Sequence, residues 1–262
     1  MTLCYPQLST GVISQFPLTK TFAYRTVVNE LPDGSAIRLS DADATTLSWD
    51  LQYSGLSSAE RDALSSFFEL TAGSLKSFLF LDPRGNLLRY SDDLTKSVWS
   101  VDGLLRVQLE DGVLHVTNTA QTASSFQQHV ATAAGYTVCG SALVRSGGGA
   151  PINVTGFLST PAVEKGSQIS VGADWTVVVT STVTDADSND VAFGLRFPAG
   201  AVVEVKNLQL EAQPGRSAYK RTAGVSGRFE ETRFDQRSLT FRADGIEDYA
   251  TTVHLTSRVR LL

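Results

Sequence analysis

The sequence predicts a mostly β fold in which a β-sandwich is inserted into a second, discontinuous domain. Val, Thr, Phe, Tyr and Trp recur in short runs separated by Gly, Asp and Asn, which favours strands over helices. From about residue 88, aromatic residues become sparse and Ala, Ser, Thr, Gly and Val dominate. The earlier aromatic-rich composition returns at Phe229, Phe234 and Phe241. We therefore expect residues 1–87 and 225–262 to form one domain, and residues 88–224 to form a jelly-roll-like insert.

The overall composition is that of a chain that folds around a buried core. Of its 262 residues, 42% are hydrophobic and 19% are charged, which argues against disorder. The 22 basic and 27 acidic residues give a net charge of -5, and no run of Lys and Arg exceeds two. Sequence-specific nucleic-acid binding is therefore not expected. Cys4 and Cys139 lie far apart in the sequence, which predicts two unpaired thiols.

Targeting and membrane signals are not found in the sequence. No apolar run approaches the roughly 18 residues that a membrane-spanning helix needs. Residues 1–10 lack the basic start and the apolar run of a secretion signal. We therefore expect synthesis and folding in a cytoplasm, without membrane insertion.

The first segment predicts three strands and one helix. Residues 46–53 alternate between apolar and polar side chains, which indicates a half-buried strand. Residues 22–28 predict another strand, ended by the turn-forming residues 32–34. The apolar run 77–81 predicts a buried strand. A helix is expected from the capping-box spacing of Ser57 and Glu60 to the stop at Gly73.

The insert predicts short strands separated by turns, as in a β-sandwich. These strands are expected at Leu104–Leu109, Val113–Thr117, Thr137–Val144, Trp175–Val183, Val191–Phe197 and Val202–Leu210.

The final segment predicts a strand-like stretch at residues 237–242, a turn at Asp244-Gly245 and then a long strand. That long strand has an apolar face, which begins at Tyr249 and ends at Leu261. Its opposite face is polar and includes Thr252, His254, Thr256, Arg258 and Arg260. Such a strand suits an outer or interface position.

A search for catalytic chemistry finds no strong candidate. The sequence has neither a Gly-x-Ser-x-Gly nucleophile elbow nor a glycine-rich phosphate loop with its lysine. Acidic residues that are available for glycoside hydrolysis fall in expected turns, where acids are common for backbone reasons. They are Glu110-Asp111, Asp185, Asp187 and Asp190, and Glu230-Glu231. We expect no catalytic residues and no enzymatic activity.

Metal and cofactor sites are not expected either. His115, His129 and His254 each lack a second His or Cys at metal-ligand spacing, and we interpret them as surface histidines. Residues 185–190 resemble a calcium loop in composition, but the sequence has no glycine at the turn and no closing Glu. A solvated hairpin tip is the simpler interpretation.

Four aromatic residues are candidates for stacking on sugars, because an aromatic face packs well on a pyranose. They are Trp99, Tyr136, Trp175 and Tyr219. Val98 precedes Trp99, and the apolar run 177–179 follows Trp175, so both tryptophans are predicted to belong to the core. The sequence therefore assigns no sugar-binding residue.

The first and last segments share a set of motifs, at residues 11–18, 24–26, 31–35, 49–53, 56–60, 67–68, 73 and 78–83, and at Gly227-Arg228-Phe229 and Arg233-Phe234-Asp235 near the end. Together these motifs resemble distal tail proteins, which are tail-tip proteins of phages and of phage-derived gene transfer agents. It implies a split β-barrel with one packed helix and a ring-forming role between the tail tube and the tip hub. Six copies is the arrangement that it implies, and a hub subunit of threefold symmetry is the alternative.

The insert has a resemblance of its own. Residues 86–91 with Trp99 open it, and residues 205–211 and 217–222 close it. This bracket is similar to the carbohydrate-binding-module-like jelly rolls of phage tail proteins. Neither resemblance implies a catalytic residue or a cofactor.

Three hypotheses follow. The first is a structural virion protein of a phage tail tip or baseplate, made in the bacterial host cytoplasm, with the tail tube and tip hub as its partners. The second is adhesion to a host-surface glycan through the insert. The third is a cell-wall hydrolase. In a ring, the polar face of the last strand is expected either to contact a neighbour or to line the lumen.

Overall fold

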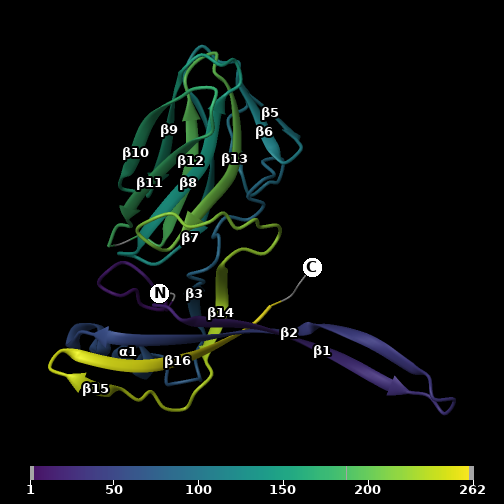
Figure 1. The fold of residues 1–262 in the computed structure, drawn as a ribbon, viewed down its shortest axis with the longest axis vertical. Coiled ribbons are helices and arrows are strands. Elements are labelled where there is room, and N and C mark those ends of the chain that lie inside the picture. The colour runs from purple at the N-terminus through teal and green to yellow at the C-terminus, as the bar shows by residue number, and fades with distance from the viewer. Residues whose placement is uncertain (1–2, 187, 260–262) are drawn as a thin grey trace. The chain divides into compact units, whose positions relative to one another are not determined.

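The structure is a computed structural model that describes residues 3–186 and 188–259, and it divides into two compact units (Figure 1). The first unit contains the chain up to Ser9, residues Ile13–Phe80 and the chain from Phe229 onward. The second contains Thr10–Val12 and Leu81–Arg228.

The first unit is built on one six-stranded sheet with the order β1-β2-β16-β14-β3, to which β15 is added beside β16. Its strands are β1 (Leu18–Glu30), β2 (Ala36–Leu56), β3 (Phe78–Leu81), β14 (Arg228–Phe234), β15 (Arg242–Gly245) and β16 (Asp248–Arg258). The sheet is open, because no pairing joins β1 to β3 in the part of the chain that the structure describes. The closed barrel implied by the resemblance is therefore not found there.

The core of the first unit is aromatic. Trp49 and Leu51 of β2 are fully buried, as the alternation predicts, and Tyr53 is 2% exposed. Phe234 lies 4.9 Å from Phe68 between ring centroids, and the surrounding rings lie at similar separations, which suit edge and tilted aromatic contacts. The other rings of this cluster are Tyr5, Phe67, Phe78 and Phe80.

Helix α1 (Ser58–Leu70) covers part of this core and confirms the predicted helix. The Ser57 hydroxyl accepts a hydrogen bond from the Glu60 amide, and the Glu60 carboxylate accepts one from the Ser57 amide at 3.0 Å, so the capping box is complete. Thr71 is the C-cap, and Ala72 and Gly73 follow it with positive φ values of 51° and 63°, so the left-handed stop expected at Gly73 begins one residue earlier. Among the described residues, no helix is long and apolar enough to cross a membrane.

The second unit is a β-sandwich of the jelly-roll type, made of two five-stranded antiparallel sheets with the orders β10-β9-β12-β7-β4 and β11-β8-β13-β6-β5. The strands are β4 (Ser100–Val101), β5 (Leu105–Glu110), β6 (Val113–Asn118), β7 (Ser124–Ala131), β8 (Thr137–Ser146), β9 (Ile152–Ser159), β10 (Glu164–Val171), β11 (Thr176–Val183), β12 (Asp190–Phe197) and β13 (Val202–Glu211).

The two sheets of the sandwich approach closely enough to require glycine at some positions. A Cβ atom at Gly140 of β8 would lie 2.1 Å from the Phe193 ring of β12 in the opposite sheet. A Cβ atom at Gly156 of β9 would lie 2.6 Å from Val178 of β11. The small residues of the insert therefore allow aromatic side chains from one sheet to reach the backbone of the other.

Four strands of the insert lie outside the ranges that the sequence predicts, namely β4, β7, β9 and β10. Strand β10 has the sequence EKGSQISV at a sheet edge, with few large apolar residues to mark it. The strand expected at residues 237–242 is wrong, because β15 begins only at Arg242. The turn that follows lies at Ile246-Glu247 rather than at Asp244-Gly245.

The aromatic cluster predicts the effect of truncating Phe234. Because this side chain is 1% exposed and contacts several rings, Phe234→Ala should lower the free energy of unfolding of the first unit by about 3–5 kcal/mol. Urea unfolding followed by near-UV circular dichroism measures the loss. Phe16→Ala is the control, because Phe16 is 82% exposed and its truncation should change stability by less than about 0.5 kcal/mol. Equal effects of the two substitutions would contradict the assigned core.

Candidate functional site

An extended two-stranded arm carries several exposed apolar side chains of the first unit. Strand β16 pairs with β2 only from Thr46 to Leu56, whereas β1 pairs with β2 back to Ala36. The outer half of the β1-β2 hairpin is therefore a two-stranded ribbon, beside which the described residues place no third strand (Figure 1). Arg25 and Asp41 form an ion pair across this ribbon at 3.5 Å.

Both faces of the arm expose apolar side chains. Leu39 pairs with Val27, and Ile37 pairs with Asn29, so these side chains share one face. Leu39 is 51% exposed and Ile37 is 47% exposed. Val28 lies on the opposite face and is 43% exposed. Tyr24, next to the bulge in β1, is 66% exposed.

The tip of the arm is a well-formed turn. The Asp33 carboxylate accepts hydrogen bonds from the Ser35 hydroxyl and the Ser35 amide, and these bonds lower the pKa of Asp33. Gly34 adopts a positive φ of 83° that the turn requires. The turn predicted at residues 32–34 is confirmed, and it fixes the register of the strands that present the apolar side chains.

The sheet of the first unit has a polar outer face, as the last strand predicts. His254 of β16 contacts Asp50 of β2 with 2.5 Å between Nδ1 and Oδ1. Thr252, Thr256 and Arg258 lie on the same side of β16, whereas Val253 and Leu255 are fully buried. Arg260 and Leu261 lie outside the described residues.

A cleft of about 400 Å³ opens beside this polar face. Its walls include Phe16 and Pro17, Gln52 and Tyr53 of β2, and Arg242 of β15. Phe16 is strongly exposed. This cleft is a second surface of the first unit on which an apolar side chain meets solvent.

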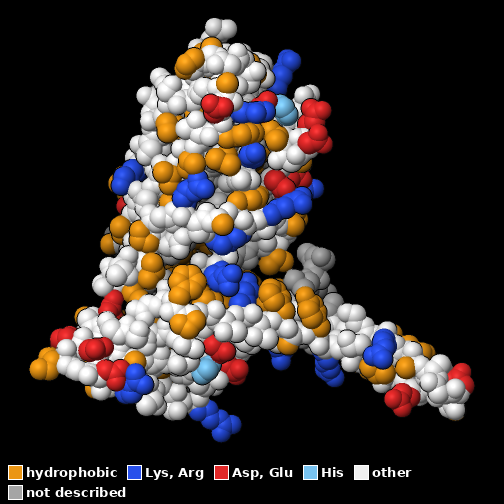
Figure 2. Space-filling view, in the orientation of Figure 1, with side chains coloured by type: hydrophobic (Ala, Val, Ile, Leu, Met, Phe, Trp, Pro, Cys, Tyr) orange, Lys and Arg blue, Asp and Glu red, His pale blue; other side chains and the backbone are white. Residues whose placement is uncertain are grey.

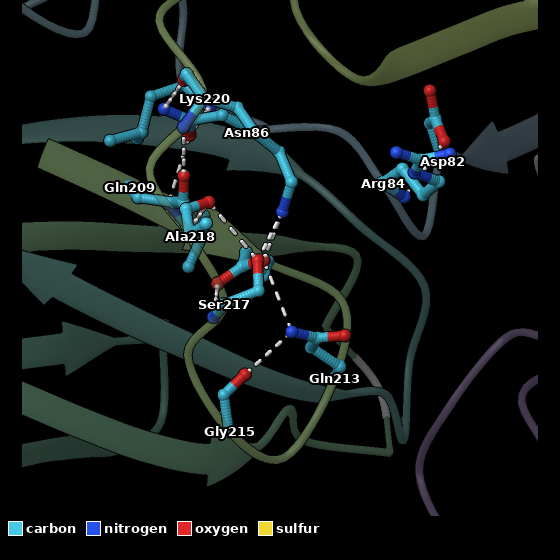
Figure 3. A network of polar contacts seen from close by, with 12 residues as sticks. Asp82, Arg84, Asn86, Gln209, Gln213, Gly215, Ser217, Ala218 and Lys220 are labelled. Atoms are coloured by element: carbon cyan, nitrogen blue, oxygen red, sulfur yellow. Dashed lines mark hydrogen bonds and ion pairs between the residues drawn. The ribbon is translucent and has the colours of Figure 1, made fainter. Parts of the chain in front are cut away.

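In the second unit, the residues at which the insert begins and ends form a polar clasp (Figure 3). Asn86 is 1% exposed and uses its whole amide group. Its Nδ2 donates to the carbonyls of Leu208 and Lys220 at 2.9 and 3.0 Å. Its Oδ1 accepts from the amides of Leu88 and Leu210 at 3.1 and 3.0 Å. One side chain therefore joins the opening segment to β13 and to the closing segment.

Glycine pairing completes the clasp. The Gly227 amide donates to the Asn86 carbonyl at 2.7 Å, and a Cβ atom at Gly85 would lie 2.6 Å from the Gly227 Cα. The segments that lead into and out of the insert therefore contact each other through their backbones at Gly85 and Gly227, an approach that only glycine permits. Asn86, Leu208, Leu210 and Lys220 belong to the motifs that bracket the insert, and in this structure their role is structural.

The closing segment folds over the outer face of β8. Glu211 of β13 is 1% exposed and forms an ion pair with Lys220 at 2.7 Å, while the Ser217 amide donates to the same carboxylate at 2.9 Å (Figure 3). Cys139 of β8 is fully buried although it lies on the outward side of its strand. Burial, followed by the nearby charge of Glu211, raises the pKa of the Cys139 thiol to about 11.

The rest of that outer face presents one tryptophan and several charges. Val144 and Val178 point inward, so Arg145 and Trp175 point outward. The Trp175 ring is partly exposed, with Lys206 Nζ 4.0 Å and the Arg145 guanidinium 4.7 Å from its centroid. The expectation that Trp175 belongs to the core is therefore wrong.

Hydrophobic and basic side chains lie side by side on the visible face of the second unit (Figure 2). Glu204 accepts from Arg145 at 2.7 Å between Oε2 and Nε. His115 lies 3.8 Å from Glu204 and 3.9 Å from Glu110, at the right distance for ion pairs when protonated.

The other aromatic candidates are structural. Trp99 is 5% exposed, donates from Nε1 to the Tyr90 carbonyl and packs edge-on against Phe126, as predicted for a core residue. Tyr136 is 6% exposed. The Tyr219 hydroxyl bonds to Ser91 at 2.8 Å within the clasp, and its partial burial raises the pKa of the phenol.

The acidic and histidine candidates make separate pairwise contacts and form no common cluster in the part of the chain that the structure describes. Asp185 accepts from the Thr160 hydroxyl, whereas Asp190 contacts His129 at 2.7 Å, so the two carboxylates have separate partners. Asp187 lies outside the described residues. No group of three His, Cys, Asp or Glu side chains that suits a metal is found in the described part of the chain. Asp111 occupies the β5-β6 turn with a positive φ of 49°. Glu230-Glu231 lie on exposed positions of strand β14, so the turn expected at these two residues is wrong.

Comparison with known proteins gives a likeness in fold only. No protein-family model and no curated protein sequence matches the chain. Among solved structures, the chain is similar to the tailspike protein 4 enzymatically active domain of bacteriophage CBA120, with 10% identity and a TM-score of 0.40. That match covers 50% of this chain and 22% of the other.

Carbohydrate-binding modules are also similar. A xylan-binding domain from CBM 22 has 12% identity and a TM-score of 0.42, covering 51% of this chain and 99% of the other. The C-terminal family 22 carbohydrate-binding module of Clostridium thermocellum Xyn10B has 14% identity and a TM-score of 0.41, covering 52% and 99%. The neighbours therefore include carbohydrate-binding modules and a phage tailspike domain.

The clasp predicts that Asn86→Ala destabilises the insert. The substitution leaves two buried amides and two buried carbonyls without their partner, so a loss of about 3 kcal/mol in the free energy of unfolding is expected. Hydrogen exchange of the amides of Leu88 and Leu210 measures the effect locally. Asn153→Ala, at an exposed position of β9, should leave the same amides unchanged. Unchanged protection in Asn86→Ala would show that the clasp does not hold the insert closed.

Burial of Cys139 predicts that its thiol is unreactive in the folded protein. With a pKa raised to about 11, the thiolate is scarce at pH 8, and the covering segment blocks access. Iodoacetamide labelling followed by peptide mass spectrometry should modify Cys139 only after unfolding in urea. Labelling of Cys139 in the native protein as fast as that of a free thiol peptide would contradict the covering role of residues 211–222.

Proposed function

We propose that this chain is a non-enzymatic structural subunit of a phage-type tail tip, of the distal tail protein kind. In this proposal the first unit assembles into a ring that joins the tail tube to the tip hub, and the insert is displayed as a carbohydrate-binding-like module. The observation that supports it most directly is the β1-β2 arm with apolar side chains exposed on both faces.

The arm requires a partner on physical grounds. An isolated two-stranded ribbon is only marginally stable in water. Apolar side chains that face water on both sides of the ribbon further disfavour an uncovered arm. A second surface that covered the arm would remove apolar area from water and so stabilise it. The side chains concerned are Leu39 and Ile37 on one face and Val28 on the other. A ribbon that extends past its own sheet can reach such a surface on a neighbouring copy.

Ring closure follows from the same geometry. A contact in which the arm of one copy covers a different surface of the next is heterologous, and heterologous contacts close into rings when the rotation permits. The open edge of the sheet at β1 supplies a further position where a strand of a neighbouring copy can pair. The outer edge of β3 is already bonded within the chain, because Leu79 accepts from the Tyr5 amide and donates to the Leu3 carbonyl. The resemblance to distal tail proteins implies six copies, and a threefold hub subunit is the alternative.

A second candidate function is adhesion to a glycan through the insert. The observation that favours it is the partly exposed Trp175 ring on the outer face of the β11-β8-β13-β6-β5 sheet. An aromatic ring in such a position packs against the apolar face of a pyranose. The two candidates are compatible, because they use different units.

The mass of the purified protein tests the ring. Light scattering over a concentration series should give six times the mass of one chain, and Leu39→Asp should shift it toward the mass of one chain, because a charge on the arm opposes burial. Val163→Asp is the control: Val163 is 54% exposed in the insert, and its substitution should leave the mass unchanged.

Three other outcomes have defined meanings. A trimer would favour the hub alternative. A single-chain mass at every concentration, or an assembly that Leu39→Asp leaves intact, would contradict assembly through the arm.

A further inference from the structure

We infer that the outer face of the β11-β8-β13-β6-β5 sheet binds an acidic polysaccharide, with a sugar ring on Trp175 and the sugar carboxylate at Lys206 and Arg216. This inference rests on the second candidate function, glycan binding by the insert, and it names the chemical class of the ligand.

The position of Trp175 makes its ring available. Trp175 precedes β11 at an outward position, and its ring is partly exposed. Phe157, which lies on the outer face of the opposite sheet, is 1% exposed, with the Arg196 guanidinium 4.8 Å from its ring centroid. The exposure of the two rings therefore differs, and of these two side chains Trp175 is the one that solvent reaches.

The charge next to Trp175 is basic and only partly neutralised. Arg145 is paired with Glu204, whereas Lys206 has no carboxylate within ion-pair distance among the described residues. The Lys206 ammonium is held instead by the Trp175 ring, a contact of modest strength at an exposed site. Its charge therefore remains available to an anion, although the whole chain is acidic.

A small polar cleft lies directly beside Lys206. Lys206 pairs with Leu143, which forms part of the cleft wall. A bulge in β13, at which Asn207 has a positive φ of 57°, brings Asn207 into the same wall. The exposed Arg216 is also a wall residue. The cleft volume is about 60 Å³, which suits a carboxylate or hydroxyl group and is too small for a sugar ring.

These parts form one continuous site. Outward positions of β8 run from Arg145 beside Trp175 to Leu143 and then to Ser141 at the cleft. Two residues along a strand correspond to roughly 7 Å, so a sugar ring on Trp175 and a carboxylate at the cleft lie within one or two sugar units. Arg and Lys bind carboxylates through charge-assisted hydrogen bonds, which a neutral sugar does not form.

Binding to matched charged and uncharged polymers tests the inference. The full-length protein is titrated with polygalacturonate, hyaluronan and polysialic acid, and with the methyl-esterified or carboxyl-reduced form of each, by isothermal calorimetry. We expect at least one acidic polymer to bind about tenfold or more tightly than its uncharged form. Lys206→Gln should weaken that binding by about tenfold, and Trp175→Ala by at least as much. Lys165→Gln, which removes an exposed charge from β10 in the opposite sheet, should change it less than about twofold.

Each contrary result has a separate meaning. Equal affinity for the charged and uncharged forms, or wild-type affinity in Lys206→Gln, overturns the acidic specificity and leaves glycan binding standing. No binding of any polymer overturns both this inference and the glycan-binding candidate. The ring proposal is unaffected by either result, because it is judged by the mass of the assembly. Circular dichroism of Trp175→Ala checks its fold, and Lys206→Gln keeps the test decisive if the tryptophan variant unfolds.

Discussion

The double role of strand β2 is the constraint on which the first unit depends. Its second half lies between β1 and β16 and places Trp49 and Leu51 in the core. Its first half pairs with β1 alone. The core therefore anchors one end of the β1-β2 hairpin, while the other end is exposed. A single 21-residue strand, β2, contributes both to the packed core and to the exposed arm.

The insert is possible because its two ends meet. Gly85 and Gly227 touch through their backbones, and Asn86 joins the opening segment to β13 and to the closing segment. An insertion closed in this way behaves as an independent β-sandwich with its own core. Its outer faces are then free to differ: one covers its aromatic residue with Arg196, and the other leaves Trp175 partly exposed.

The elements with strong local signals could be predicted from the sequence. The alternation around Trp49 and the Ser57–Glu60 capping box are each determined by neighbouring residues. Strand β10 was missed because an edge strand with the sequence EKGSQISV buries few side chains. Trp175 was misplaced because the apolar run 177–179 hides which positions of β11 face inward.

Features that depend on contacts between distant residues could not be predicted from the sequence. The bracket motifs rest on resemblance, but three of the four hydrogen bonds of the Asn86 side chain join segments more than a hundred residues apart. The residues of the arm were predicted as strands, yet their exposure depends on where β16 ends, at Arg258 beside Thr46. The small cleft at Asn207 depends on a bulge that follows from pairing with β8.

Hydrogen exchange of the arm amides, compared between dilute single chains and the assembled protein, tests the central claim most directly. If the arm is the assembly element, the amides of residues 24–41 exchange rapidly in the dilute protein and slowly in the assembly. The amides of β16 should exchange equally in both states, because their partners lie within one chain. Arm exchange that is the same in both states would show that the arm remains uncovered, and would contradict assembly through it.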